Sequence, residues 1–116
     1  KINVNVPMHV AATEEEARTG FTKTIDNYLG TLRDIGRARG ASKGSSRADS
    51  LTADIVMEEF AAVGTPDQVS AKLEQLKEIY EPQEFMCWFN IGGMLPHAEI
   101  ESSMRLFAKE VMPRFQ

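Results

Sequence analysis

The stretch from Glu84 to Phe115 constrains the fold more than any other part of this sequence. It opens with an uninterrupted apolar run, Phe85 to Phe89, which is typical of a parallel strand that is buried on both faces. Pro96 can begin a helix in its first turn, where the N–H that proline lacks would have no partner. That helix is indicated by apolar residues at helical spacing, namely Ile100, Met104, Phe107 and Val111. The stretch therefore predicts one β–α unit of a parallel α/β protein, in which ligands bind at the carboxyl ends of the strands.

A second β–α unit is predicted at the start of the chain. Apolar and polar residues alternate from Ile2 to Val10, which indicates a strand. Pro7 removes one ladder donor, so we expect this strand at a sheet edge or irregular near its end. Thr13 and Glu16 form a predicted capping box, and an apolar stripe then continues the helix to about Ile35.

The middle of the chain predicts a flexible linker and then a third unit. Residues 36–50 are rich in Gly, Ser and basic side chains and contain almost nothing apolar, which favours a solvated loop over a lid. A short helix over 51–59 and a short buried strand over 60–63 follow. Thr65 and Gln68 then predict a capped helix whose apolar stripe comprises Val69, Leu73, Leu76 and Tyr80. Repeated β–α units predict parallel strands with right-handed crossovers and the helices outside, within a single domain over residues 1–116.

Composition limits the classes of function. The net charge of −4 gives no general attraction to nucleic acid or to an acidic membrane surface. No apolar run approaches the roughly 20 residues that a membrane-spanning helix needs. The first residues, Lys1 to Val4, lack the apolar region of a signal peptide. Lys1 is not a normal translation start, so we expect that an upstream segment is missing. Its single cysteine, Cys87, cannot form an intrachain disulfide, and this favours a reducing, cytoplasmic compartment.

Three segments, taken in this order, resemble luciferase-like flavin-dependent monooxygenases, the bacterial luciferase superfamily. Residues 9–18, His-Val-Ala-Ala-Thr-Glu-Glu-Glu-Ala-Arg, are similar to a family strand that ends in the helix start V-A-x-T-x-E-E-A. Residues 60–69 contain Gly-Thr-Pro-Asp-Gln-Val, which is similar to the family junction G-T/S-P-E-x-V. Residues 89–97 and 104–113 resemble the last strand, loop and closing helix of the family.

The resemblance implies the carboxyl-terminal part of a TIM (β/α)8 barrel that binds reduced FMN, or a related flavin or deazaflavin. Such an enzyme would use oxygen on an organic substrate. A full barrel takes roughly 250 residues, so this chain holds about the last three β–α units, and we expect it to be inactive alone. The alternative is a non-catalytic α/β domain that associates with itself, most simply as a homodimer, because the edge and face left open by missing strands would need cover.

Candidate site residues lie around the last strand and its loop. Trp88 or Phe89 would pack on a flavin or substrate wall, and which of them does so stays open, because neighbours on a strand point oppositely. The other cofactor-binding candidates are Asn90, as a polar contact, and Gly92 and Gly93, for close backbone approach. The alternative is a purely structural role, in which Trp88 belongs to the hydrophobic core and the two glycines turn the chain into the next helix. His97 and His9 are candidates for substrate binding; no catalytic residue is assigned, and no metal-ligand spacing is present.

Overall fold

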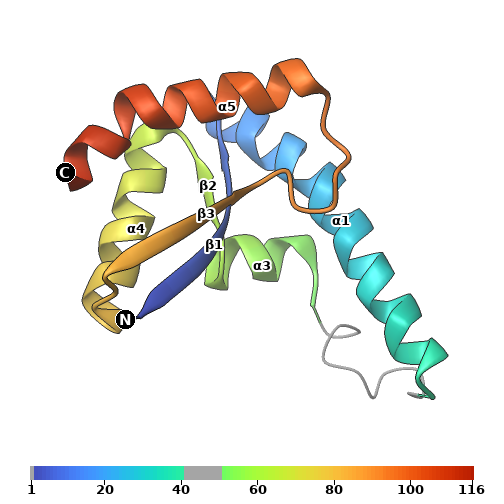
Figure 1. Ribbon diagram of the computed structural model, residues 1–116. Coiled ribbons are helices and arrows are strands. Elements are labelled where there is room, and N and C mark those ends of the chain that lie inside the picture. Colours follow the sequence, from blue (N-terminus) through green and yellow to red (C-terminus); the bar gives the residue numbers. More distant parts are fainter. Residues whose placement is uncertain (1, 41–50) are drawn as a thin grey trace.

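The computed structural model describes residues 2–40 and 51–116 of the protein (Figure 1). Within these residues, one three-stranded parallel sheet is surrounded by helices, so the predicted α/β class with parallel β–α units is confirmed. The elements in chain order are β1 (Asn3–Val10), α1 (Glu14–Ala38), α3 (Ala53–Glu59), β2 (Ala62–Gly64), α4 (Pro66–Tyr80), β3 (Glu84–Phe89), α5 (His97–Glu110) and the 3-10 helix η1 (Met112–Phe115).

Side-chain caps decide where most of these helices begin. The Thr13 hydroxyl accepts a hydrogen bond from the Glu16 amide at 3.2 Å, and α1 starts there as predicted. Thr65 and Gln68 form the full predicted capping box of α4. Pro96 is the N-cap of α5 rather than a residue of its first turn. None of the helices in the two described ranges carries an apolar stretch that could traverse a bilayer.

Helix α1 extends into the range 36–50 that was predicted as a linker. Helix α1 continues to Ala38, so the first residues of the predicted linker are helical, and residues 39 and 40 form a turn. The remainder of the predicted linker, residues 41–50, lies outside the described residues. The prediction of a single domain with an internal flexible linker stays a prediction.

The strand order is β2-β1-β3, which makes β1 the central strand and corrects the expectation that it lies at an edge. β1 pairs with β3 from Asn3 to Met8, and with β2 only from Met8 to Val10. At Pro7, β1 therefore has a strand neighbour on one side only, which explains how a proline fits into the central strand.

Helices cover both faces of the sheet, whereas we expected them on one outer side (Figure 1). One core lies between β1, β2 and helix α4, with parts of β3 and α5 packed against it; its buried members are Val6, Met8, Val10, Ala62, Val69, Leu73, Leu76 and Val111. The other lies toward α1 and α3; its buried members are Phe21, Ile25, Leu29, Ala53, Val56, Met57, Ala61 and Ile91. Within the sheet, the chain moves from β1 to β2 in one direction, and then from β2 across β1 to β3 in the opposite direction. Right-handed crossovers in opposite directions place their helices on opposite faces.

The apolar stripes are only partly buried. Tyr80 on α4 and Met104 on α5 are exposed, although the spacing predicted both as core. In β3, Phe85, Cys87 and Phe89 are half-buried against the α4 side.

The expectation that β3 is buried on both faces is wrong, because Met86 is 58% exposed and Trp88 39% exposed. β3 is an edge strand, and only part of its other face is covered. Ile91, which follows the strand, lies in the other core and not on the face that Phe89 occupies. Asn90 adopts a left-handed backbone conformation with φ 57°, which ends the strand and directs Ile91 into the α1 core.

Candidate functional site

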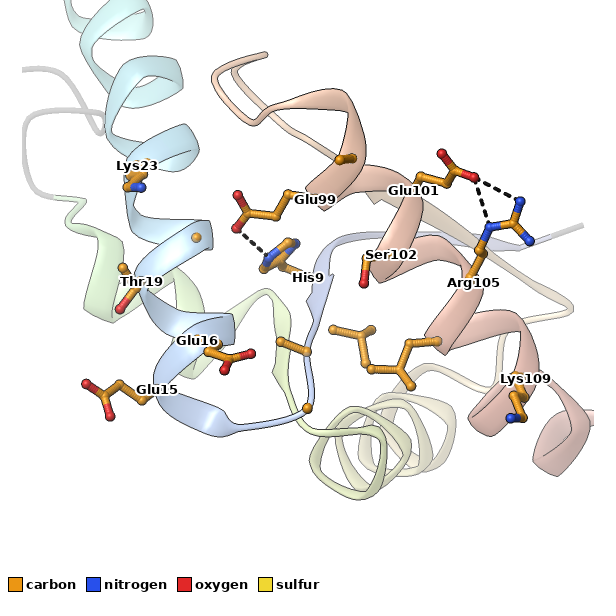
Figure 2. Close-up of a pocket in the computed structure, with 16 residues that line it drawn as sticks. His9, Glu15, Glu16, Thr19, Lys23, Glu99, Glu101, Ser102, Arg105 and Lys109 are labelled. Carbon is orange, nitrogen blue, oxygen red and sulfur yellow. Dashed lines mark hydrogen bonds and ion pairs between the residues drawn. The ribbon is translucent and has the colours of Figure 1, made fainter.

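A groove of about 950 Å³ opens where β1 ends, between α1 and α5 (Figure 2). Its floor is the end of β1 and the loop that follows, residues 9–12. One wall is the first part of α1, from Glu15 to Lys23, and the other is α5, from Ala98 to Lys109. The strand order reverses at β1, and in open parallel sheets ligands bind outside the strand ends at such a reversal. The groove therefore has the position and the size of a ligand site.

His9 stands at the floor of this groove. Its side chain is 3% exposed, and its Nε2 lies 3.6 Å from Oε1 of Glu99 on α5. The ring fits there because α1 has a glycine opposite it. A Cβ at Gly20 would lie 2.7 Å from His9 Nε2 and 2.6 Å from Glu99 Oε1, which is closer than real Cβ contacts. Three elements thus meet around one imidazole: β1, α1 and α5.

Burial controls the charge of this imidazole. Desolvation lowers the pKa of His9 below its usual value, and the neighbouring Glu99 carboxylate opposes that shift only in part. His9 is therefore mainly neutral at neutral pH. A neutral imidazole has one nitrogen that donates a hydrogen bond and one that accepts. In His9, Nε2 faces the Glu99 carboxylate and is the natural donor, which leaves Nδ1 as the acceptor.

Charged side chains of both signs surround the rim. Arg105 donates to Glu101 Oε1 from Nε at 2.9 Å and approaches the same oxygen with Nη2 at 2.8 Å. Lys109 lies one turn further along α5, and Lys23 stands on the opposite wall. Apolar parts of the lining come from Val10, Ala11, Ala12, Ala98 and Leu106. Such a groove can hold a ligand that combines a flat apolar body with an anionic group.

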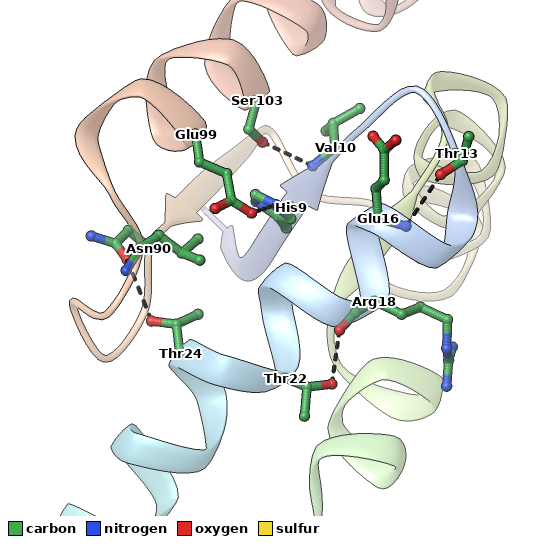
Figure 3. A network of polar contacts seen from close by, with 11 residues as sticks. His9, Val10, Thr13, Glu16, Arg18, Thr22, Thr24, Asn90, Glu99 and Ser103 are labelled. Atoms are coloured by element: carbon green, nitrogen blue, oxygen red, sulfur yellow. Dashed lines mark hydrogen bonds and ion pairs between the residues drawn. The ribbon is translucent and has the colours of Figure 1, made fainter.

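A buried hydrogen bond fixes α5 above the strand ends (Figure 3). The amide of Val10, the last residue of β1, donates to Oγ of Ser103 at 2.8 Å. A strand amide at a carboxyl end needs a partner when it is buried, and the hydroxyl on α5 supplies it. The wall of the groove is thereby tied to its floor.

The aromatic candidates lie away from the groove and on opposite faces of β3. Trp88 packs edge to face against Tyr28 of α1, with ring centroids 5.6 Å apart. Phe89 packs in the same manner against Phe107 of α5, with centroids 5.7 Å apart. The two side chains cannot line one site together.

The loop candidates hold the chain against α1. Asn90 Oδ1 accepts from the Leu95 amide at 3.1 Å and from the Thr24 hydroxyl at 3.4 Å (Figure 3). The Gly92 carbonyl accepts from Asn27 Nδ2 at 2.9 Å, and a Cβ at Gly92 would run into the Thr24 carbonyl. Gly93 has φ 71° and open space around it. In this chain Asn90 and Gly92 thus form hydrogen bonds that hold the loop in place against α1.

Of the site residues predicted from the sequence, His9 is the one that lines the groove. The His97 side chain is 92% exposed at the start of α5 and lies 3.8 Å from Glu101. Sequence reasoning missed Gly20, Glu99 and the basic pair on α5. The sequence did show Gly20 inside an amphipathic helix, which is a sign of close packing, but it did not show that the neighbour is His9. Whether any of these residues contacts flavin or substrate stays a prediction.

Fold and groove together define a parallel α/β protein with an open groove at the carboxyl end of its central strand. The family model for luciferase-like monooxygenases matches residues 1–80. The chain therefore belongs to the luciferase-like monooxygenase family, as predicted, and the matched residues include the first two of the three resembling segments. No curated protein matches its sequence.

Solved structures of monooxygenases share the fold. Monooxygenase RslO1 from Streptomyces bottropensis is 23% identical, with a TM-score of 0.62 over 98% of this chain and 31% of its own. The oxygenating constituent of 3,6-diketocamphane monooxygenase from the CAM plasmid of Pseudomonas putida, in complex with FMN, is 18% identical, with a TM-score of 0.62 over 97% of this chain and 33% of its own. Apo-MsnO8 is 21% identical, with a TM-score of 0.57 over 93% and 33%. The chain thus spans about a third of the length of these structures.

Proposed function

We propose that this chain is the carboxyl-terminal part of a flavin-dependent luciferase-like monooxygenase, and that its groove between α1 and α5 contributes to a reduced-flavin site. The observation that carries the proposal is the position of the groove, at the carboxyl end of the central strand of a family member. One solved relative is in complex with FMN, which supports this choice of cofactor.

The lining fits the two halves of a flavin nucleotide. Arg105 and Lys109 offer cationic groups on one face of α5 for a phosphate, and Val10, Ala11 and Leu106 offer apolar surface for a flat ring. FMN and phosphorylated deazaflavins share these features, so the lining residues do not favour one of these cofactors over the other. A bound reduced flavin would supply the electrons that activate oxygen. The chain's own residues would bind and orient it, with the neutral His9 at the floor.

We further propose that oxygenation of an organic substrate requires more β–α units than this chain contains. It spans about a third of its solved relatives, and a complete barrel has eight strands. The chain alone is then expected to bind flavin weakly and to show no monooxygenase turnover.

Titration with FMN tests the proposal. We expect saturable binding by isothermal titration calorimetry, for oxidised FMN and, under anaerobic conditions, for reduced FMN. Riboflavin should bind at least about five-fold more weakly, since it lacks the phosphate that the basic pair would hold. R105Q should weaken FMN binding by a similar factor and leave riboflavin binding unchanged.

R114Q is the matched control, because Arg114 also makes a surface ion pair, with Asp67 at 2.9 Å, but lies outside the groove. It should bind FMN as the unmodified chain does. The proposal would be contradicted by absence of binding at millimolar FMN, or by equal effects of R105Q and R114Q.

The second candidate function is a non-catalytic domain that associates with itself. The exposed side chains of Met86 and Trp88 on β3 favour it, since apolar surface of this kind often marks an interface. Self-association and flavin binding use different surfaces of the chain, so each can be measured without the other.

A further inference from the structure

Glu99 and Gly20 have no place in flavin chemistry as described so far, yet both are in contact distance of His9. Glu99 reaches it from α5, and Gly20 faces it from α1. Glu99 is distant from His9 and Gly20 in the sequence, and it reaches them because α5 crosses the end of β1 (Figure 3). A convergence of three elements on one buried imidazole indicates that the orientation of the ring matters.

Gly20 is unusual for its place in the helix. It lies inside α1, where glycine costs about 1 kcal/mol relative to alanine. α1 contains a second interior glycine, Gly30, which has nothing within 4 Å of its Cβ position. At Gly20 a methyl group would instead displace both the imidazole and the carboxylate. The absence of a side chain at residue 20 thus has a specific structural consequence for this pair.

Other charged groups face the groove without reaching His9. Glu15, Glu16 and Lys23 line it from α1. From α5, Lys109 lines it, and Glu101 and Arg105 pair with each other. Among the described residues, Glu99 alone lies within ion-pair distance of the imidazole. The separation of 3.6 Å is longer than a good hydrogen bond, so the two side chains do not fully satisfy each other's hydrogen-bonding groups.

We propose that Glu99 is a positioning residue for His9, and that Gly20 leaves room for the two to stand at the groove floor, where His9 contacts the polar edge of the bound ligand. This inference rests on the proposed function for the choice of flavin as ligand. The arrangement of His9, Glu99 and Gly20 is a property of the chain alone and can be measured without any ligand.

The first experiment follows the imidazole of His9 by NMR as pH is varied in the ligand-free chain. Because the Glu99 carboxylate favours protonated His9, E99Q should move the His9 titration to lower pH. E101Q is the matched control on the same helix and should leave the His9 titration where it was. Equal titration of His9 in the unmodified chain and in E99Q would overturn the proposal, whatever the outcome of flavin binding.

The second experiment measures FMN affinity against pH. Affinity should fall as His9 becomes protonated, the midpoint of this fall should move to lower pH in E99Q, and H9Q should remove the dependence. G20A should reduce FMN affinity at least about five-fold, whereas G30A should leave it unchanged and raise the melting temperature through helix propensity. Equal affinities of G20A and G30A would contradict the role of Gly20. Absence of FMN binding in every variant, with a shifted His9 titration in E99Q, would refute the proposed function and the ligand contact but retain the positioning role.

Discussion

His9 links stability to pH because it is buried in a mainly neutral form. In the folded chain, desolvation lowers the pKa of this imidazole, with Glu99 as the opposing influence. In the unfolded chain it returns to about 6.5. A group whose pKa is lowered by folding binds protons more readily when unfolded, so its contribution favours folding above the unfolded pKa and is lost at lower pH.

The free energy of unfolding should therefore decrease as pH falls from about 7.5 to about 5.5, a window set by the usual histidine pKa near 6.5. H9Q should remove most of this slope, because no titrating imidazole remains at the groove floor. H97Q serves as the control, since that side chain is exposed on α5 and should leave the slope unchanged. Urea denaturation at several pH values measures it. Identical slopes for H9Q and the unmodified chain would show that another group is responsible.

At the residue scale, the sequence can point to candidate side chains but does not predict which side chains they contact. His9 was a candidate because it is one of the polar residues that alternate with apolar ones along a predicted strand, and it lies near the carboxyl end of that strand. Glu99 was not, because its partner lies near the opposite end of the chain and no local pattern connects them. Trp88 shows the reverse: its type suggested a buried wall, but its strand lies at the edge of the sheet, and the side chain is half-exposed beside Tyr28.

At the scale of elements, the loop between β3 and α5 determines how α5 reaches the groove. Gly92 and Gly93 both adopt left-handed backbone conformations, with φ 90° and 71°. They differ in their surroundings, since Gly92 packs against the backbone of α1 at Thr24, and Gly93 faces open space. Substitutions at these two adjacent glycines can therefore distinguish the cost of backbone strain from the cost of close packing.

G93A should lower the free energy of unfolding by about 1–2 kcal/mol, the usual cost of a left-handed conformation for a residue with a Cβ. G92A has the same cost and must also move the loop away from α1, so we expect a loss of about 3 kcal/mol or more. Urea denaturation of both variants measures the difference. Equal losses would mean that the loop does not pack closely on α1.

Helix starts could be predicted from sequence because their causes are local. Thr13 and Thr65 cap the helices that they were expected to cap, within three residues of their partners. The strand order could not be predicted in the same way. A β–α–β crossover is right-handed whether the next strand is added on one side or the other, so the rule leaves the order β2-β1-β3 undetermined. That order decides that β1 is central and that helices cover both faces.

At the scale of the whole molecule, one part of the sheet surface lacks cover among the described residues. Met86 and Trp88 are exposed on β3, and on the neighbouring strand β1 Asn3 and Asn5 face solvent. α1 diverges from the sheet as it leaves the groove (Figure 1), and it covers this region only in part, where Tyr28 packs against Trp88. In a longer family member further β–α units could cover it, whereas for this chain a second copy is the available partner.

We therefore predict that the chain forms a two-fold dimer at micromolar concentrations through this face. Burying Met86 and Trp88 would remove apolar surface from water, and because they are 58% and 39% exposed, each would contribute part of the roughly 1.5–3 kcal/mol that a fully buried large side chain gives. M86K should shift sedimentation velocity profiles toward monomer, because association would then bury a charge without a partner. M104K is the matched control, since Met104 is similarly exposed but lies on α5. A concentration-independent monomer for the unmodified chain, or equal shifts for the two variants, would rule out this interface.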